Sequence, residues 1–314
     1  MNLHPIRHPC HLRLYTGEPD LRRISALVHA AVDDHLHAVD LPYRLSSWAF
    51  DDPANAGLWF DESGELMAWA VLQTPFWTID FALQPAATHL HPEVLAWADA
   101  RAREALPTTS GRPAWFVSVF EDQADFIRDL EAAGFQCQAS APQDPWSQVW
   151  MARPSHIPVP EAAPPPGFAI RPLAGEQEVG AYVALHRSAF GTGNMTREWR
   201  ARTFRQPEYR PDLDLVAAAP DGRLTAFCVC WHDLRGPGGR PCGQIEPLGV
   251  GEEFRRLGLG RAILAEGIRR LRALGAEQVI VETDNYRDDA FDLYESSGFR
   301  VIRNVLVFRQ DYAS

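Results

Sequence analysis

The residues with the clearest chemical spacing lie between 245 and 261, where the chain reads IEPLGVGEEFRRLGLGR. An apolar stretch ends near Val250, the pattern Arg255-x-x-Gly258-x-Gly260 follows, and a helical apolar pattern begins at Ala262. Glycines let backbone N–H groups approach a ligand closely, and the amino end of a helix attracts anions. The spacing therefore predicts a phosphate-binding turn between a strand and a helix.

Two common phosphate motifs do not fit this turn. The Walker pattern needs a Gly-Lys-Ser/Thr ending, and Gly260 is followed by Arg261. The dinucleotide fingerprint needs a third glycine where Ile263 stands. What remains is R-x-x-G-x-G after a strand that contains Glu246.

That remaining pattern resembles the GNAT superfamily of N-acetyltransferases, whose motif Q/R-x-x-G-x-G/A wraps the pyrophosphate of acetyl-coenzyme A. A second match is Ala290-x-x-Leu293-Tyr294-x-x-x-Gly298-Phe299, which agrees with the family's A-x-x-L-Y-x-x-x-G-F signature. The resemblance covers essentially all of 168–312. It implies that acetyl-coenzyme A (acetyl-CoA) is the cosubstrate.

The resemblance also implies which residues contact the cosubstrate. Backbone groups of Leu248, Gly249 and Val250 correspond to the strand end that bonds the pantetheine arm, and Asn285 stands where the family often has a cofactor-contacting asparagine. The residues that correspond to the pyrophosphate loop are Arg255, Arg256, Leu257, Gly258, Leu259, Gly260 and Arg261.

Acetyl transfer to an amine needs a base, because a free primary amine has a pKa of about 10 and is protonated at neutral pH. Glu246 is placed for this role inside the strand, acting directly or through water, and Gln244 shares its face by the period of two. The alternative is that Glu246 only orients the substrate or pairs with an arginine.

A general acid is also needed to protonate the leaving thiolate. The resemblance assigns this role to Tyr294, and the alternative is a helix tyrosine packed against the sheet. It also implies that a backbone N–H at the strand bulge, at Val250, stabilises the oxyanion. We expect the acceptor wall in the stretch 186–210, which includes Phe190, Trp199 and Phe204, although aromatic residues there could equally be core.

Composition excludes several functional classes. The chain of 314 residues is 46% hydrophobic and 23% charged, and its formal net charge of -11 argues against a nucleic-acid partner. No apolar run approaches the roughly 18 residues of a membrane helix, and the first residues lack the apolar core of a signal peptide, so we expect no membrane association and a cytoplasmic protein.

Cysteine and histidine spacing does not predict a metal site. The five cysteines include no C-x-x-C pair, and Cys228 and Cys230 share one face of a predicted strand, which favours buried thiols. His35 and His37 lie beside Asp33 and Asp34, but side chains two positions apart do not share a helix face. We therefore predict that no metal is bound.

The first half of the chain alternates strands and helices. The hydrophobic pattern predicts strands at 11–15, 76–85, 114–120 and 147–154, a hairpin at 58–73 that turns at Ser63-Gly64, and helices at 19–31, 92–105 and 124–135. Residues 154–167 contain six prolines and predict an extended linker.

The second half repeats this order. The predicted strands are 168–173, 243–250, 278–283 and 301–312, with a hairpin at 213–233 that turns at Asp221-Gly222. The predicted helices are 176–190, a helix from the glycine turn to Leu274, and 288–299. The shared order on both sides of a linker favours an internal duplication.

The first copy lacks the chemical residues of the second. Its equivalent of the pyrophosphate loop is 84–92, which has no arginine, no glycine and two prolines, and Leu130 stands in place of Tyr294. We therefore expect 1–153 to be a degenerate acetyltransferase-like domain, 154–167 a linker, and 168–314 the catalytic, acetyl-CoA-binding domain.

The sequence thus predicts an α/β protein with two tandem acetyltransferase-fold domains, each a mostly antiparallel mixed sheet flanked by helices. The two-copy layout is similar to that of the mycothiol synthase group, a likeness of architecture that does not fix the acceptor. We expect direct acetyl transfer from acetyl-CoA to a small-molecule amine in a ternary complex. A non-catalytic acyl-CoA-binding or sensing module is the alternative, and monomer and homodimer both stay open.

Overall fold

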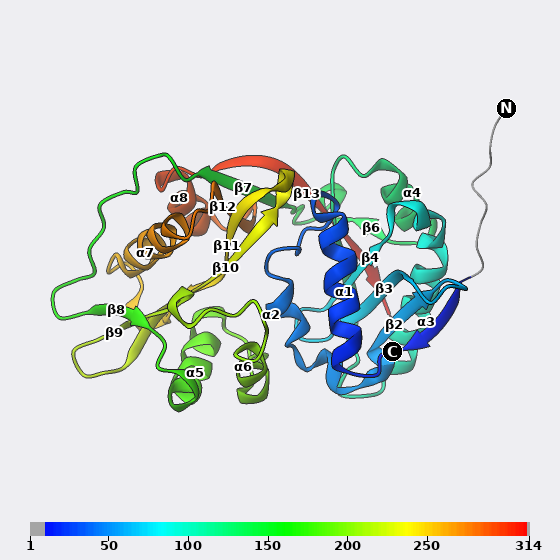
Figure 1. Cartoon of the computed structure of the whole chain (residues 1–314), viewed down its shortest axis with the longest axis horizontal. Coiled ribbons are helices and arrows are strands. Elements are labelled where there is room, and N and C mark those ends of the chain that lie inside the picture. Colours follow the sequence, from blue (N-terminus) through cyan, green and yellow to red (C-terminus); the bar gives the residue numbers. More distant parts are fainter. Residues whose placement is uncertain (1–9, 313–314) are drawn as a thin grey trace. The chain divides into compact units, whose positions relative to one another are not determined.

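The computed structural model describes residues 10–312 and divides into two compact units (Figure 1). Within the described residues, unit 1 comprises 10–35, Trp48–Cys137 and 308–312. Unit 2 comprises Leu36–Ser47 and Gln138–Val307. Each unit has its own strands and helices except for strand β13 (Arg300–Asp311), which contributes residues to both.

Unit 1 is a sheet with helices packed on it. Its strands run in the order β1-β2-β3-β4-β5, and neighbours are antiparallel except β4 and β5, which pair in parallel at Thr78 and Phe116. The strands are β1 (His11–Leu14), β2 (Ala56–Phe60), β3 (Leu66–Gln73), β4 (Thr78–Leu83), β5 (Ala114–Phe120) and β6 (Gln136–Cys137), and the helices are α1 (Glu18–Ala30), α3 (His91–Ala105) and α4 (Ala124–Ala132).

Unit 2 has a longer sheet in the order β13-β7-β12-β11-β10-β9-β8, antiparallel except for the β11 and β12 pair. Its strands are β7 (Gln148–Pro154), β8 (Ala169–Pro172), β9 (Asp214–Ala218), β10 (Leu224–Gly236), β11 (Arg240–Val250), β12 (Gln278–Asp284) and β13 (Arg300–Asp311), whose last residues belong to unit 1. Its helices are α2 (Leu41–Leu45), α5 (Val179–Phe190), α6 (Arg197–Thr203), α7 (Leu259–Ala273) and α8 (Asp288–Ser296).

The helices α5 and α7 cover opposite faces of the unit 2 sheet (Figure 1). Phe227 of β10 stacks on the His186 ring of α5, whereas the next residue, Cys228, lies under Gly267 of α7. Successive side chains of a strand point to opposite faces, so these contacts fix one helix on each side. The apolar face predicted for α7 is confirmed, since Ile263, Leu264, Ile268 and Leu271 are buried.

Most predicted elements are confirmed to within a few residues, and the fold is a mixed α/β fold with mostly antiparallel strands. Cys228 and Cys230 are buried on one face, with their Sγ atoms 3.6 Å apart, as the strand period predicts. The short helices α2 and α6 were not predicted, because each spans less than two turns of clear periodicity.

The compact units do not follow the predicted division at the linker. Strand β7 precedes the linker, yet it pairs with β12 from Gln148 opposite Asp284 to Pro154 opposite Gln278. The segment Leu36–Ser47 also belongs to unit 2. For β7, the predicted and observed divisions differ because the strand hydrogen-bonds to a strand distant in sequence, and hydrophobic periodicity does not predict such pairing.

Candidate active site

Glu246 lies at an irregularity in β11. The register with β10 pairs Cys230 with Ile245 and then Cys228 with Leu248, so β11 has one extra residue at this point. The indole Nε1 of Trp231 donates a hydrogen bond of 2.7 Å to the Glu246 carbonyl oxygen. The bulge and this bond hold the backbone of Glu246, whose side chain is half-buried.

Beyond Gln244 the strands β11 and β12 separate. Their parallel register extends from Cys242 opposite Gln278 to Gln244 opposite Ile280 and ends there within the described residues. Leu248, Gly249 and Val250 continue to pair with β10 on their other edge. The edge of β11 that faces β12 therefore offers backbone groups to an extended ligand.

The predicted glycine turn caps α7. Gly258 precedes the helix with φ of +80°, a conformation that favours glycine, and Arg256 also has a positive φ of 64°. A Cβ on Gly260 would lie 3.4 Å from Val250 Cγ2, so helix and strand approach closely here. By helix geometry, the N–H groups before Ala262 have no acceptor within the helix and are directed at the turn.

The three arginines of this turn are exposed, and the polar contacts of their side chains lie at the surface. Arg255 donates to the Ala189 carbonyl at 2.9 Å, and Arg256 lies 3.1 Å from Asp289 Oδ1. Arg261 donates to Ser296 Oγ at 3.2 Å. Such surface contacts contribute little stability, so the guanidinium groups stay available to an anion at the amino end of α7.

Tyr294 of α8 is buried, 7% exposed, and packs edge to face on Phe299 with ring centroids 5.6 Å apart. Burial, and next the negative charge of Glu246, raise the pKa of the Tyr294 phenol well above its usual value. The phenol is therefore a proton donor throughout the neutral range, and it is an electrostatic neighbour of Glu246.

Asn285 follows β12 and is bonded to the backbone of Ser147. Its Oδ1 accepts from the Ser147 N–H at 3.0 Å, and its own N–H donates to the Ser147 carbonyl at 2.9 Å. These bonds give Asn285 a structural function at the start of β7. Its predicted contact with the cosubstrate stays a prediction.

Two acidic residues that were not predicted, Asp40 and Glu282, act on Glu246 electrostatically. Asp40 is buried, and its N–H donates to Gln244 Oε1 at 3.2 Å. Burial, and then the charges of Asp40 and Glu282, raise the pKa of Glu246 to about 8. Glu282 could have been noticed in the sequence, because it is a charged residue within the apolar strand β12. Asp40 could not, because it lies far from Glu246 in the sequence.

Of the aromatic residues predicted for the acceptor wall, Trp199 is buried and packs against Tyr43 as a core residue does. Trp199 of α6 donates from Nε1 to the Tyr43 carbonyl at 3.1 Å, and their rings lie 5.1 Å apart. The Tyr43 hydroxyl lies 3.4 Å from Nε2 of His186. Of the other residues predicted for the wall, Phe190 packs on His186 and Phe204 on Tyr209. The structure thus brings Trp199 beside the segment that carries Asp40.

Residues 180–299 match the acetyltransferase (GNAT) family. The matched segment, called the GNAT segment below, contains Glu246, the glycine turn, Asn285 and Tyr294. The mycothiol acetyltransferase of an Arthrobacter species is 32% identical to the chain over 163 residues, which cover 49% of this chain and 50% of that protein. The chain thus spans about half the length of the curated relatives it matches.

Solved structures share the fold over nearly the whole chain. A GCN5-related N-acetyltransferase from Sphaerobacter thermophilus superposes with a TM-score of 0.62 at 20% identity, covering 96% of this chain and 95% of that one. A tandem GNAT protein from the clavulanic acid biosynthesis pathway gives 0.62 at 13% identity, covering 98% and 99%. The fold is therefore shared with a tandem GNAT protein.

The stretch of unit 1 that corresponds to the glycine turn has a different local structure. The predicted counterpart of the turn, 84–92, forms a 3-10 turn over Pro85–Leu90 that leads into α3. The rings of Phe81 and Phe126 lie 4.7 Å apart, and His91 contacts both Phe126 and Asp129, the latter at 2.9 Å. Phe126 corresponds to Ala290 of the GNAT segment, so a bulky ring replaces a methyl group.

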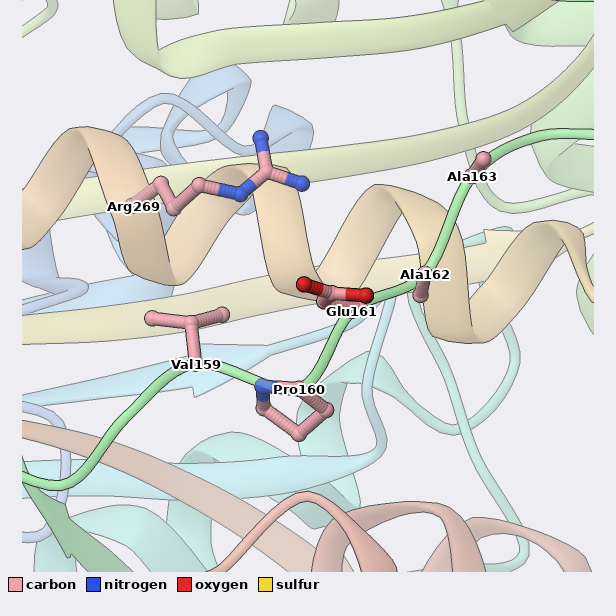
Figure 2. Close-up of a pocket in the computed structure, with 6 residues that line it drawn as sticks. All are labelled: Val159, Pro160, Glu161, Ala162, Ala163 and Arg269. Atoms are coloured by element: carbon pink, nitrogen blue, oxygen red, sulfur yellow. The ribbon is translucent and has the colours of Figure 1, made fainter.

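A surface pocket elsewhere in unit 2 lies where the linker passes α7, and Figure 2 shows its lining residues Val159, Pro160, Glu161, Ala162, Ala163 and Arg269. Its cation, Arg269, already pairs with Glu266. No residue predicted for the site lines this pocket.

Within residues 10–312, no group of three or more histidine, cysteine, aspartate or glutamate side chains is arranged to hold a metal ion. Likewise, no helix in this described part is long and apolar enough to cross a membrane.

Proposed function

We propose that the chain is an N-acetyltransferase that transfers the acetyl group of acetyl-CoA directly to a small-molecule amine in a ternary complex. The proposed active site lies in the GNAT segment. The observation that supports the proposal is that Glu246 lies on β11 just beyond its pairing with β12, with Tyr294 as an electrostatic neighbour and with a glycine turn and three exposed arginines following the strand.

The cosubstrate would lie along β11. Leu248, Gly249 and Val250 would bond the pantetheine arm through their backbone groups, in the way an added strand pairs with a sheet edge. The N–H groups that precede Ala262, together with Arg255, Arg256 and Arg261, would hold the pyrophosphate. Leu257 and Leu259 belong to the same turn, the first exposed and the second buried.

The proposed proton transfers use two ionisable side chains, Glu246 and Tyr294. The acceptor approaches as an ammonium ion, which favours the ionised form of Glu246 by its charge. Glu246 takes a proton, the neutral amine attacks the thioester carbonyl carbon, and the carbon–sulfur bond breaks. The Val250 N–H would stabilise the oxyanion, and Tyr294 would give its proton to the leaving thiolate. The second proton, which the acetylated nitrogen loses, would restore the Tyr294 phenol.

The amino-terminal half, 1–153, would be a degenerate copy without a cosubstrate. The Phe81 and Phe126 pair and the absence of arginine and glycine from 84–92 support this. Titration calorimetry with coenzyme A then gives one equivalent bound per chain. Two equivalents would contradict the degenerate copy.

An acceptor screen tests the activity. The full chain is incubated with acetyl-CoA and a panel of small amines, including amino sugars, amino acids and polyamines, and acetylated products are detected by mass spectrometry. A product that depends on Glu246 supports the proposal. Binding of acetyl-CoA without transfer to any amine would instead favour a binding or sensing module.

A further inference from the structure

His37 lies between two carboxyl groups that come from different parts of unit 2. Its Nδ1 is 3.4 Å from Oδ1 of Asp40, on its own segment, and 3.8 Å from Oε2 of Glu282 on β12. One ring nitrogen therefore faces both carboxyl groups within ion-pair range. Protonated, this imidazole can compensate both charges.

Because these groups are largely buried, compensation of their charges is more stabilising than it would be in water. The side chains of Asp40, Glu282 and His37 are 1%, 13% and 22% exposed. Neither carboxylate oxygen of Asp40 has a well-formed hydrogen bond within the described residues. A buried carboxylate without donors is costly, so a nearby cation stabilises its charged form.

The same cluster acts on Glu246. The charged groups around His37 are Asp40 and Arg44 on its own segment, Glu246 on β11, and Glu282 with its neighbour Asp284 on β12. Asp40 and Glu282 oppose ionisation of Glu246, whereas His37 and Arg44 favour it. His37 thus offsets the two groups that most disfavour a charged base.

We propose that His37 is a positioning residue for acetyl transfer, whose imidazolium bridges Asp40 and Glu282 and thereby keeps Glu246 able to ionise as the base. This inference rests on the proposed function. It assigns to the amino-terminal half a part in the chemistry of the GNAT segment, although His37 itself need not touch the substrate.

The pH dependence of kcat/KM tests the proposal. In His37→Gln the rising limb that reports Glu246 should move to higher pH by about half a unit or more, a roughly threefold lower rate at neutral pH, with the plateau at alkaline pH retained. His37→Lys, which keeps a cation, should move the limb much less. Glu282→Gln should move it to lower pH, because a negative neighbour is removed.

The matched control is His156→Gln, since His156 is an exposed histidine of the linker. Its profile should coincide with that of the unaltered chain. A His37→Gln profile that is lowered equally at every pH would show a merely structural role and overturn the proposal. So would a limb that moves in the same direction in His37→Gln and Glu282→Gln.

A second readout is independent of turnover. Burial and Arg44 oppose protonation of His37, but Asp40 and Glu282 more than offset them and raise its pKa. Histidine NMR of the full chain, with His37 assigned from His37→Gln, should show titration above the usual value of about 6.5, falling in Glu282→Gln. An ordinary or lowered pKa overturns the inference. Absence of transfer by the unaltered chain would instead overturn the proposed function.

Discussion

The indole N–H of Trp231 donates a 2.7 Å hydrogen bond to the carbonyl oxygen of Glu246. This bond joins β10 to β11 at the bulge, where the regular register is interrupted. It holds the backbone of the proposed base while its side chain stays free to react. The position of the base therefore depends on a side chain of the neighbouring strand.

Trp231→Phe should keep the apolar contact and remove this bond. A hydrogen bond of this kind contributes about 1 kcal/mol, so kcat should fall roughly fivefold while the affinity for coenzyme A is unchanged. The matched control is Trp69→Phe in unit 1, because the Trp69 Nε1 has no partner within the described residues. Equal losses of kcat in both variants would contradict the assignment.

Glu246→Gln should lower kcat/KM by about 100-fold to 10,000-fold, the range of general-base catalysis. In the unaltered chain the rate should rise with pH up to about 8, where the Glu246 carboxyl group loses its proton. A pH–rate profile of the chain checks this. Glu277→Gln, which changes an exposed glutamate, should leave the profile in place.

Stability should respond to Glu246→Gln in a pH-dependent direction. The folded chain holds the Glu246 proton up to about pH 8, whereas the unfolded chain releases it near 4.5. Between these values the folded state binds more protons, so the free energy of unfolding falls as pH rises. Glu246→Gln should therefore raise Tm more at about pH 9 than at about pH 5. An equal shift at both would argue against a buried, protonated carboxyl group.

Tyr294→Phe should lower kcat roughly 100-fold or more without weakening coenzyme A binding, because the phenol is proposed to act only on the leaving thiolate. Steady-state kinetics and calorimetry check the two quantities separately. Tyr312→Phe, at a buried tyrosine of unit 1, controls for the loss of a hydroxyl from the interior. If affinity and kcat fall together, the residue serves packing instead.

Gly258→Ala should weaken coenzyme A binding. Gly258 and Gly222 have similar positive φ values, +80° and +85°, and a Cβ at either would meet open space among the described residues. Each substitution should therefore cost about 1 kcal/mol of stability through backbone strain. Only Gly258→Ala should reduce the affinity, as measured by calorimetry, since Gly222 lies in the hairpin turn. Equal affinities would disconnect the turn from the cosubstrate.

The sequence predicted what local patterns encode. Periodicity gave α7 and its buried face, and the turn residues placed Gly258 ahead of the helix. Glu246 was identified from its place in the strand that leads into the glycine turn, because acetyl transfer to an amine needs a base. These inferences depend on residues close together in the chain, where spacing and geometry are directly linked.

The rest of the site depends on pairing between distant segments. Asp40 and His37 lie more than two hundred positions before Glu246, and no local pattern indicates that Asp40 bonds Gln244 on the same strand. The hydrogen-bond partner of Asn285 could not be predicted for the same reason, since Ser147 lies 138 positions away, before the linker. Residues 33–37 were considered only as a possible metal site, so His37 was not predicted to be a charge partner of Asp40 and Glu282.

Strand β7 limits where the chain could be cut. A fragment beginning at the linker would keep the whole GNAT segment, yet it would leave one edge of β12 bare from Gln278 to Asp284. Bare edges recruit strands from other molecules and promote aggregation. Such a fragment would also lack Asp40 and His37, so an inactive or insoluble product would not contradict the proposed activity, which should be tested on all 314 residues.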